Sequence, residues 1–188
     1  YKVSKTREAT RLLNTLTGED IELGTFKIIT PEGLKYLPIK LTKAQMMEAY
    51  QLYKNPKNLE TFKEGMHWTP EVLTAIVNNL SEQDIAFADW LQEEFYDTYY
   101  DKINPFYREE FNIDMPKNPD YVPQSRDFTA QEDNEVLMLV KDQGRYASVT
   151  NKSLKARKQN IRPFQLNGVF NVVTNHIVQM EHFIRGTR

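Results

Sequence analysis

The sequence contains no cysteine. Disulfide bonds, thiolate nucleophiles and cysteine-based metal sites are therefore excluded, and the composition fits a reducing compartment. Long apolar runs are also missing: none approaches the roughly 18 residues of a membrane-spanning helix, so we predict no membrane span. All seven glycines stand alone, which excludes a glycine-rich phosphate-binding loop, and no Gly-x-Ser-x-Gly turn is present.

Histidine is scarce as well, with only His67, His176 and His182 in the chain. The last two point in different directions on a helix and lack the four-residue spacing of a metalloprotease pair. We therefore expect packed or hydrogen-bonded histidines, and we predict no metal site, no cofactor and no enzymatic activity. An enzyme with an unrecognised carboxylate site is kept as the weakest alternative.

The 188 residues suffice for one domain with a hydrophobic core or for two small ones. Their net charge of −2 hides an uneven distribution. Residues 60–135 contain 18 acidic and 5 basic side chains, whereas the basic stretch, residues 141–162, contains 7 basic and 1 acidic. This asymmetry indicates internal complementarity or a charged partner, and two differently solvated faces explain it equally well.

The first 40 residues predict a short helix followed by one β-hairpin. Leu12, Leu13 and Leu16 form a weak helical stripe that must pack on something. Apolar and polar residues then alternate imperfectly on either side of a turn at residues 30–33. An isolated hairpin is marginally stable, so we expect it to pack on a helix or to pair with another strand.

Helices are predicted for most of the remaining chain. Thr42 caps the first of them, with Gln45 at the capping-box position. A short helix over residues 57–64 is closed by Gly65. The last helix covers residues 168–185 and has an apolar stripe along one face.

The chain is organised around residues 81–123. Residues 81–103 predict one long helix, because apolar side chains recur at spacings of three or four: Ile85, Ala88, Leu91, Phe95 and Tyr99. Three more aromatic side chains widen this face, so we expect the helix to be covered on more than one side: Phe87, Trp90 and Tyr96.

A proline-rich arm follows this helix. Prolines at 105, 116, 119 and 123 exclude a continuous helix, and Pro105 is the expected stop. We expect residues 115–123 to run extended, with Met115 and Tyr121 largely buried against the long helix.

The other face of the long helix carries the acidic row, four carboxylates that each follow the last by four residues: Asp89, Glu93, Asp97 and Asp101. Like charges at this spacing repel one another. The row is a candidate face for a basic partner, or a solvated surface. A divalent cation is a weaker interpretation, because no Glu-x-x-His motif supplies further ligands.

The candidate phosphate- or acid-binding residues lie in the basic stretch: Lys152, Lys155, Arg157, Lys158 and Arg162. They could contact phosphates without sequence specificity, although no interleaved aromatic residues are present for base stacking. Docking on the acidic row is the other interpretation. We predict that Lys155 or Arg157 lies within salt-bridge distance of Asp89, Glu93, Asp97 or an acid of the arm.

Together these patterns predict a mostly α fold: a multi-helix orthogonal or antiparallel bundle with one small N-terminal β-hairpin and an extended proline-rich arm. We divide the chain into an N-terminal helix and hairpin, residues 1–40, and a helical domain, residues 41–188. The first residue is Tyr1 rather than methionine, so we expect a piece of a longer polypeptide.

Three segments, in this order, carry a resemblance to a known family. The first is Ala88-Asp89-Trp90-Leu91 with Asn104-Pro105-Phe106-Tyr107-Arg108 and the arm Met115-Pro116…Asp120-Tyr121-Val122-Pro123. The others are Ser153-Leu154-Lys155-Ala156-Arg157 and Val178-Gln179-Met180-Glu181-His182-Phe183-Ile184. Over roughly residues 34–184 the chain resembles a helical region in the very large polyvalent proteins of tailed phages and related mobile elements.

In that family, enzyme domains are strung together with helical modules, and the proteins travel inside the virion and enter the host with the DNA. The resemblance implies a non-catalytic structural or interaction module of a phage internal virion protein, either cargo or ejected. It implies partners among other domains or copies of a phage virion protein, and a location in the virion interior followed by delivery to the host cytoplasm. The alternative is a nucleic-acid-binding module attached to a phage polymerase or nuclease, with phage DNA bound by the basic stretch.

Overall fold

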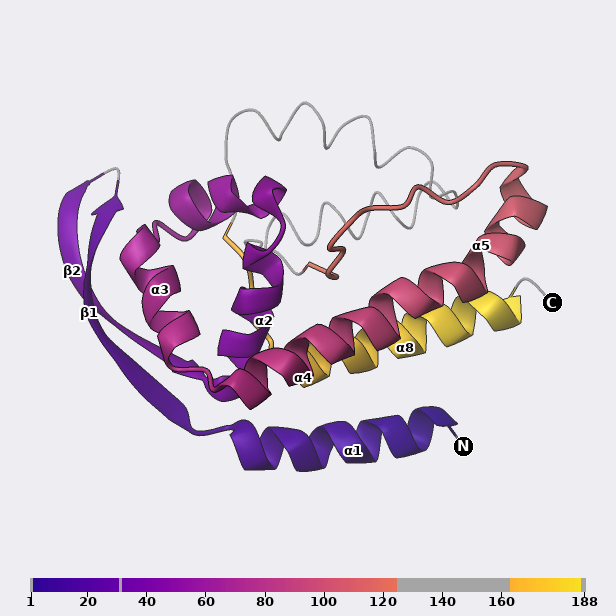
Figure 1. The fold of residues 1–188 in the computed structure, drawn as a ribbon, viewed down its shortest axis with the longest axis horizontal. Helices are drawn as coiled ribbons and strands as arrows, with labels where there is room; N and C mark the ends of the chain where they lie inside the picture. Colours follow the sequence, from indigo (N-terminus) through magenta and orange to yellow (C-terminus); the bar gives the residue numbers. More distant parts are fainter. Residues whose placement is uncertain (1, 31, 125–162, 187–188) are drawn as a thin grey trace.

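The computed structural model describes residues 2–30, 32–124 and 163–186 of the protein. These residues are mostly helical, with a two-stranded antiparallel hairpin near the N-terminus (Figure 1), so the predicted fold class is confirmed. In chain order the elements are α1 (Lys2–Thr17), β1 (Asp20–Thr30), β2 (Gly33–Thr42), α2 (Lys43–Tyr53), η1 (Pro56–Asn58), η2 (Thr61–Gly65), α3 (Pro70–Asn78), α4 (Glu82–Gln92), η3 (Glu93–Asp97), α5 (Thr98–Phe111) and α8 (Val169–Gly186).

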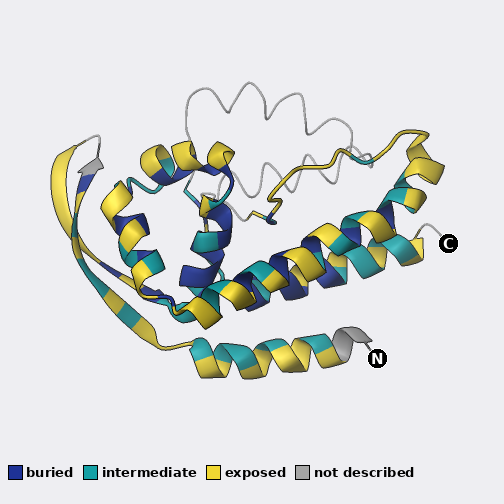
Figure 2. Cartoon of the chain, viewed as in Figure 1, coloured by how far each residue is buried: buried dark blue, intermediate teal, exposed yellow. Residues whose placement is uncertain are grey.

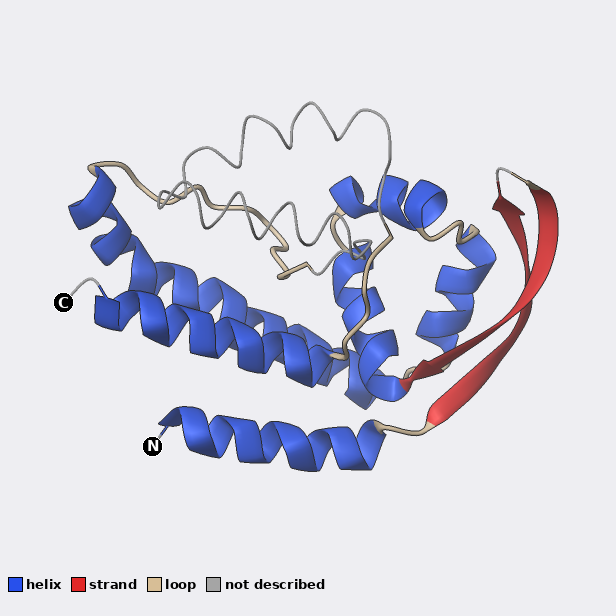
Figure 3. Ribbon diagram, turned by 180° about the vertical axis from the view of Figure 1, so that it is seen from behind, coloured by secondary structure: helices blue, strands red, loops and turns tan. Residues whose placement is uncertain are grey.

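The longest helices form one layer. α4, η3 and α5 follow a single helical path, α8 lies along it, and α1 lies beyond α8 (Figures 1 and 3). α8 runs parallel to α4 and α5, because the ring of Phe87 lies near that of Phe170 and, further along both helices, the hydroxyl of Tyr99 donates to the carboxylate of Glu181. α2 crosses this layer at a steep angle (Figure 1).

Polar side chains hold α1 to α8. The Nδ2 of Asn14 donates to the Oδ1 of Asn171 at 2.8 Å, and the hydroxyls of Thr10 and Thr174 are hydrogen-bonded to each other. Leu13 packs against the core, while the other two leucines of the predicted stripe stay exposed. α8 is therefore the surface on which the N-terminal helix packs, and the order of the contacts makes the two helices antiparallel.

The hairpin is long, and its base joins the hydrophobic core. Thr30 pairs with Gly33 at the predicted turn, and Gly33 has φ 120°, a conformation that favours glycine. Most of the outer half of the hairpin is exposed (Figure 2), but Ile28, two pairs from the turn, is buried in the common core, as are Ile39 and Leu41 nearer the base. The hairpin thus packs on helices, as expected, and the division of the chain at residue 40 stays a prediction.

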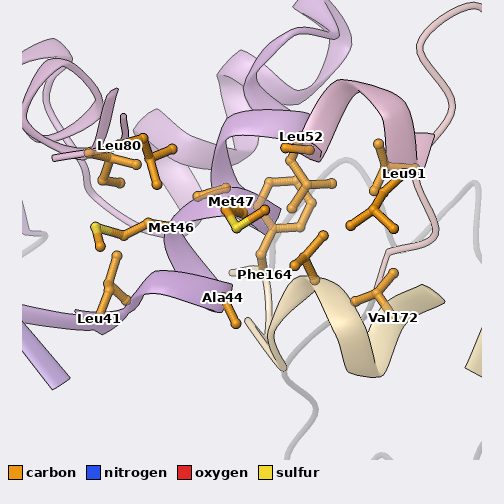
Figure 4. Packing of buried hydrophobic residues seen from close by; sticks show 14 of the residues in the cluster. Leu41, Ala44, Met46, Met47, Leu52, Leu80, Leu91, Phe164 and Val172 are labelled. Atoms are coloured by element: carbon orange, nitrogen blue, oxygen red, sulfur yellow. The ribbon is translucent and has the colours of Figure 1, made fainter. Parts of the chain in front are cut away.

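α2 lies at the centre of the core. The predicted capping box fixes its start: the backbone N–H of Gln45 donates to Thr42 Oγ1 at 3.1 Å, and the N–H of Thr42 donates to Gln45 Oε1 at 3.0 Å. Met46 and Met47 are almost fully buried. Around them Figure 4 shows side chains from β2, the link between α3 and α4, α4 and α8: Leu41, Leu80, Leu91 and Val172.

The connection from α2 to α3 is helical but irregular. It consists of the short 3₁₀ turn η1 and the π turn η2 rather than one helix over residues 57–64. Gly65 lies inside η2, so its predicted role as a cap was wrong. The wide turn carries the chain past Gly65, and the reversal comes at His67, with φ 57°, where the N–H of Trp68 donates to the carbonyl of Phe62 at 2.9 Å.

The long helix differs from its prediction in two ways. Residues 93–97 form a π turn, which fits an extra residue into one revolution. The helix then continues through Pro105 and ends at Phe111, so Pro105 is not the stop. Proline removes one helical hydrogen bond and bends the path, and the last turns of α5 lean away from the layer in Figure 1. Asn112 ends the helix in a left-handed conformation with φ 56°.

The arm therefore begins after Asn112, and side-chain hydrogen bonds fix its first part. Asn104 uses both ends of its amide: Nδ2 donates to Asp114 Oδ1 at 2.9 Å, and Oδ1 accepts the N–H of Met115 at 2.7 Å. Arg108 binds both carboxylate oxygens of Asp114, and this pair holds the pKa of Asp114 below its usual range. These side chains of α5 thus supply hydrogen-bond partners that the extended arm does not find within its own backbone.

The second part of the arm buries Val122 rather than Tyr121. Tyr121 is 41% exposed, so the prediction that it is largely buried was wrong, and Met115 is only half-buried. Successive side chains of an extended segment point to opposite sides, so the burial of Val122 turns its neighbour outward. The ring of Tyr121 still meets that of Tyr96 edge-on at 6.4 Å.

Candidate functional site

An exposed group of rings, the outer aromatic cluster, lies on α4 and η3: Phe87, Trp90 and Phe95. Phe87 and Trp90 are three residues apart, so they share a face, and their rings stack at 5.8 Å with an interplanar angle of 10°. Phe95 meets Trp90 edge-on at 5.9 Å. The long helix is covered on more than one side, as expected, because α2 and α8 both pack against it. On this side, however, Trp90 is still 49% and Phe87 38% exposed.

Acidic residues flank the outer aromatic cluster along the same helical path. Residues 82–97 contain six carboxylates and neither lysine nor arginine. Two of the carboxylates have basic partners: Lys43 lies 3.1 Å from Asp84, and Lys54 lies 2.7 Å from Asp89. The other four are exposed and form no ion pair within the described part of the chain: Glu82, Glu93, Glu94 and Asp97.

The acidic row is interrupted in space. Its regular spacing assumed an unbroken α-helix, and the π turn at residues 93–97 shifts Asp97 and Asp101 around the helix axis relative to Asp89. Asp89 is also occupied, since the hydroxyl of Tyr50 donates to it at 3.0 Å in addition to its ion pair with Lys54. Burial and the hydrogen bond to Asp89 raise the pKa of Tyr50 to about 12.

Asp97, the last residue of the π turn, and Asp101 beyond it form no ion pair with another residue that the structure describes. Burial raises the pKa of Asp97, and the nearby charges of Asp120 and Glu93 add to this rise, while Lys117 and Lys54 oppose it. Burial therefore disfavours the charged form of Asp97, while the positive and negative charges around it act in opposite directions.

The predicted basic residues lie outside the described residues: Lys152, Lys155, Arg157, Lys158 and Arg162. The salt bridge predicted between Lys155 or Arg157 and the acidic row therefore stays a prediction. For Asp89 the structure provides a partner that the sequence analysis missed, Lys54. Lysine and aspartate 35 residues apart carry no local pattern, so only the packing of α2 against α4 brings them together.

A second group, the buried polar cluster, was also missed: Gln51, Gln92, Tyr96 and His176. One polar atom of each side chain is buried without a hydrogen-bond partner. An unsatisfied buried polar group typically destabilises the fold by about 1–3 kcal/mol. Four of them are comparable with the whole stability of an ordinary domain, about 5–15 kcal/mol, so the cluster needs an explanation.

Two ionisable groups lie at this junction. Burial lowers the pKa of His176 to about 4, against a hydrogen bond to the backbone of Phe95. Burial raises the pKa of Glu48 to about 7, opposed by hydrogen bonds from the backbone of Gly168 and Asn167 at the start of α8. His176 is therefore a packed, neutral histidine, as expected, and Glu48 anchors the N-terminus of α8.

The exposed carboxylates lie near aromatic rings on the same helical path, whereas Glu48 and His176 are enclosed in the core. Within residues 2–30, 32–124 and 163–186, no three side chains of metal-ligating type gather in one place. No helix in the described part of the chain is long and apolar enough to cross a membrane.

Comparison with known proteins gives no match: no protein-family model, no curated protein and no solved structure is similar to this chain.

Proposed function

We propose that this chain is a non-catalytic interaction module whose outer aromatic cluster, with the exposed acids around it, binds a basic segment of another domain or protein copy. One observation carries the proposal: a stacked Phe87–Trp90 pair stands half-exposed in a stretch of six carboxylates without a basic residue. Large exposed aromatic groups rimmed by polar residues are typical of interaction sites.

The chemistry of the surface selects the kind of partner. Arginine and lysine are attracted to aromatic faces, and tryptophan is the best of these rings. An arginine stacked at Trp90 would find exposed carboxylates three and four residues further along the helix, at Glu93 and Glu94. Ring and carboxylate contacts reinforce each other in this position, because both prefer a cation.

The resemblance to polyvalent phage proteins supplies the setting of the proposal. In that setting the chain is a helical module of an internal virion protein, and its partners are other domains or copies of a phage virion protein. It would be carried in the virion interior and delivered to the host cytoplasm. This part of the proposal rests only on the order of the short motifs within residues 34–184, since no family model and no known protein matches the chain.

A nucleic-acid-binding module of a phage polymerase or nuclease is the second candidate. It is favoured by the basic stretch, with seven basic residues against one acidic residue in residues 141–162. Phosphates would be repelled by the acidic surface of α4, so such binding would fall to the basic stretch alone. Binding of duplex DNA that weakens steeply with salt, and that loses its salt dependence when Lys155, Arg157 and Lys158 are replaced by alanine, would favour this candidate.

The direct test is a titration of the protein into a fluorescently labelled arginine-rich peptide, followed by anisotropy. We expect binding that Trp90→Ala weakens about tenfold, as for a central aromatic contact. The double variant Glu93→Gln with Glu94→Gln should weaken it less and reduce its salt dependence. Tyr36→Ala is the matched control, because Tyr36 is a 65% exposed aromatic side chain on the hairpin.

Two outcomes would contradict the proposal. One is equal binding by the native protein and Trp90→Ala. The other is equal affinity for the arginine-rich peptide and for a glutamate-rich peptide of the same length, since charge selects the partner in this proposal.

A further inference from the structure

Four buried atoms without a hydrogen-bond partner belong to side chains that meet at the junction of α2, α4, η3 and α8: Gln51 Oε1, Gln92 Oε1, Tyr96 Oη and His176 Nε2. Their residues are 0%, 4%, 3% and 6% exposed, respectively. Buried polar groups in folded proteins are nearly always hydrogen-bonded, to protein or to ordered water. Four exceptions at one junction point to a bound group.

Contacts between these side chains and their neighbours bring the four together. The rings of Tyr96 and His176 meet edge to face at 5.1 Å. Gln92 lies one turn before Tyr96 on the same helical path. Gln51 reaches across from α2, and its Nε2 donates to the carbonyl of Ala88, one turn before Gln92, at 2.7 Å.

The donors of these side chains are already used elsewhere. The Nε2 of Gln51 is bound to the carbonyl of Ala88, and the Nε2 of Gln92 faces the carbonyl of Tyr121 at 3.5 Å. Turning either amide around would aim a donor at the cluster but would set an oxygen against that carbonyl. The imidazole of His176 hydrogen-bonds the Phe95 backbone, and since Nε2 has no partner, the bond comes from Nδ1.

The unsatisfied atoms thus include more hydrogen-bond acceptors than donors. Gln51 Oε1, Gln92 Oε1 and the lone pair of His176 Nε2 can only accept. The Tyr96 hydroxyl has one hydrogen and can serve one of these three acceptors. Two acceptors remain, and a water molecule has two hydrogens to donate.

We propose that this junction binds an ordered internal water molecule, which donates to two of the three acceptors, while the Tyr96 hydroxyl donates to the third acceptor or to the water. A water with about three protein partners is the usual form of a buried water site. A neutral donor fits better than ammonium, because burial at this junction already disfavours the charged form of His176. The proposal does not depend on the function proposed for the outer aromatic cluster.

A crystal structure of the native chain at high resolution tests this site directly. We expect one water within hydrogen-bond distance of His176 Nε2 and of at least one glutamine oxygen. A dry junction overturns the proposal, and so does a bound group other than water.

Thermal unfolding supplies the second measurement. Tyr96→Phe removes only the hydroxyl, so loss of a bonded partner should lower Tm by about 3 °C for a chain of this size. The matched control is Tyr107→Phe, because Tyr107 is only half-buried and lies on α5, away from the junction. A Tm for Tyr96→Phe that equals or exceeds that of the native protein would show that the hydroxyl is truly unbonded and would overturn the proposal.

Discussion

Phenylalanine and tryptophan stack face to face in two places in this protein, and the two places differ in almost everything else. The outer pair, Phe87 and Trp90, comes from one helix and is 38% and 49% exposed. The inner pair, Phe62 and Trp68, has nearly the same geometry, with ring centroids 5.7 Å apart and an angle of 18° between the planes, but is 1% and 8% exposed. Phe164 completes the inner aromatic cluster at 5.0 Å from Phe62.

The comparison shows that ring stacking by itself does not decide whether a cluster serves stability or binding. The inner cluster joins segments about 100 residues apart, so its burial depends on the whole fold. The outer cluster forms along one helical path and meets another element through Phe87, whose ring lies 6.0 Å from that of Phe170 on α8. The inner rings therefore mainly stabilise the fold, whereas the outer rings keep the free surface that the proposed binding requires.

The largest difference in the free energy of unfolding should come from replacing one aromatic residue of each cluster with alanine. Phe62→Ala should lower the free energy of unfolding by about 3–5 kcal/mol, because it leaves a cavity in the core. Trp90→Ala should lower it by about 1 kcal/mol or less, since only a half-exposed stacking contact is lost. Urea denaturation followed by circular dichroism measures both. Equal losses for the two variants would erase the distinction between the clusters.

The buried region should also make stability respond to pH through Glu48. In the folded protein the pKa of Glu48 is about 7 instead of 4.5. Unfolding then releases a proton between these pH values, so the free energy of unfolding should fall by about 3 kcal/mol as pH rises through this window.

His176 should act in the opposite direction. Its pKa is about 4 when folded instead of 6.5, so unfolding takes up a proton between these values, and stability should rise with pH by about 3 kcal/mol. The two slopes oppose each other in the native protein. Glu48→Gln should leave the rising slope and His176→Gln the falling one, measured as urea midpoints from pH 4 to 7.5. Parallel profiles for the two variants would refute this account.

The arm tests, with a smaller expected effect, whether the burial of a side chain rather than its aromatic character determines how much it stabilises the fold. Val122→Ala should destabilise the protein by about 1–2 kcal/mol, because Val122 is 3% exposed. Tyr121→Ala removes a larger ring that is 41% exposed, so its effect should be no greater. Matched thermal melts of the two variants decide the order. A clearly larger loss for Tyr121→Ala would mean that the ring, not the valine, anchors the arm.

The smallest expected change in stability comes from replacing Trp90 with phenylalanine, and tryptophan fluorescence tests this variant. The chain has two tryptophans, Trp68 in the inner cluster and Trp90 in the outer one. Trp90→Phe should change stability by less than about 1 kcal/mol and leave only the 8% exposed indole of Trp68. Acrylamide should then quench the emission much less than in the native protein. Undiminished quenching would mean that Trp68 is accessible to solvent, which would contradict its place in the buried inner cluster.

Local patterns in the sequence predicted the elements whose causes are local. The capping box at Thr42 is confirmed, because it depends on residues within three positions. The turn between β1 and β2 is confirmed for the same reason, since Gly33 supplies the required backbone conformation. The helical periodicity of residues 81–103 was also correct in outline, although it could not reveal the π turn at residues 93–97.

Of the candidate site, the sequence provided the acidic residues but not their environment. It predicted a basic partner for Asp89, yet Lys54 supplies that partner from α2, a pairing without any local pattern. The exposed state of Trp90 was missed because amphipathic periodicity counts an aromatic ring as apolar whether or not another element covers it. The buried polar cluster was missed because glutamine, tyrosine and histidine on helices usually face solvent or pack singly.

The sequence by itself determined the mostly α composition of this protein, the place of the hairpin, the helix starts and the uneven distribution of charge, since each depends on neighbours along the chain. Only the tertiary structure decided which stacked pair is buried, which turn of the long helix widens, and which polar atoms come together at the junction. Those outcomes depend on contacts between distant segments. Phe164 against Phe62, Gln51 against Ala88 and His176 against Tyr96 form only when α2, α4 and α8 pack together.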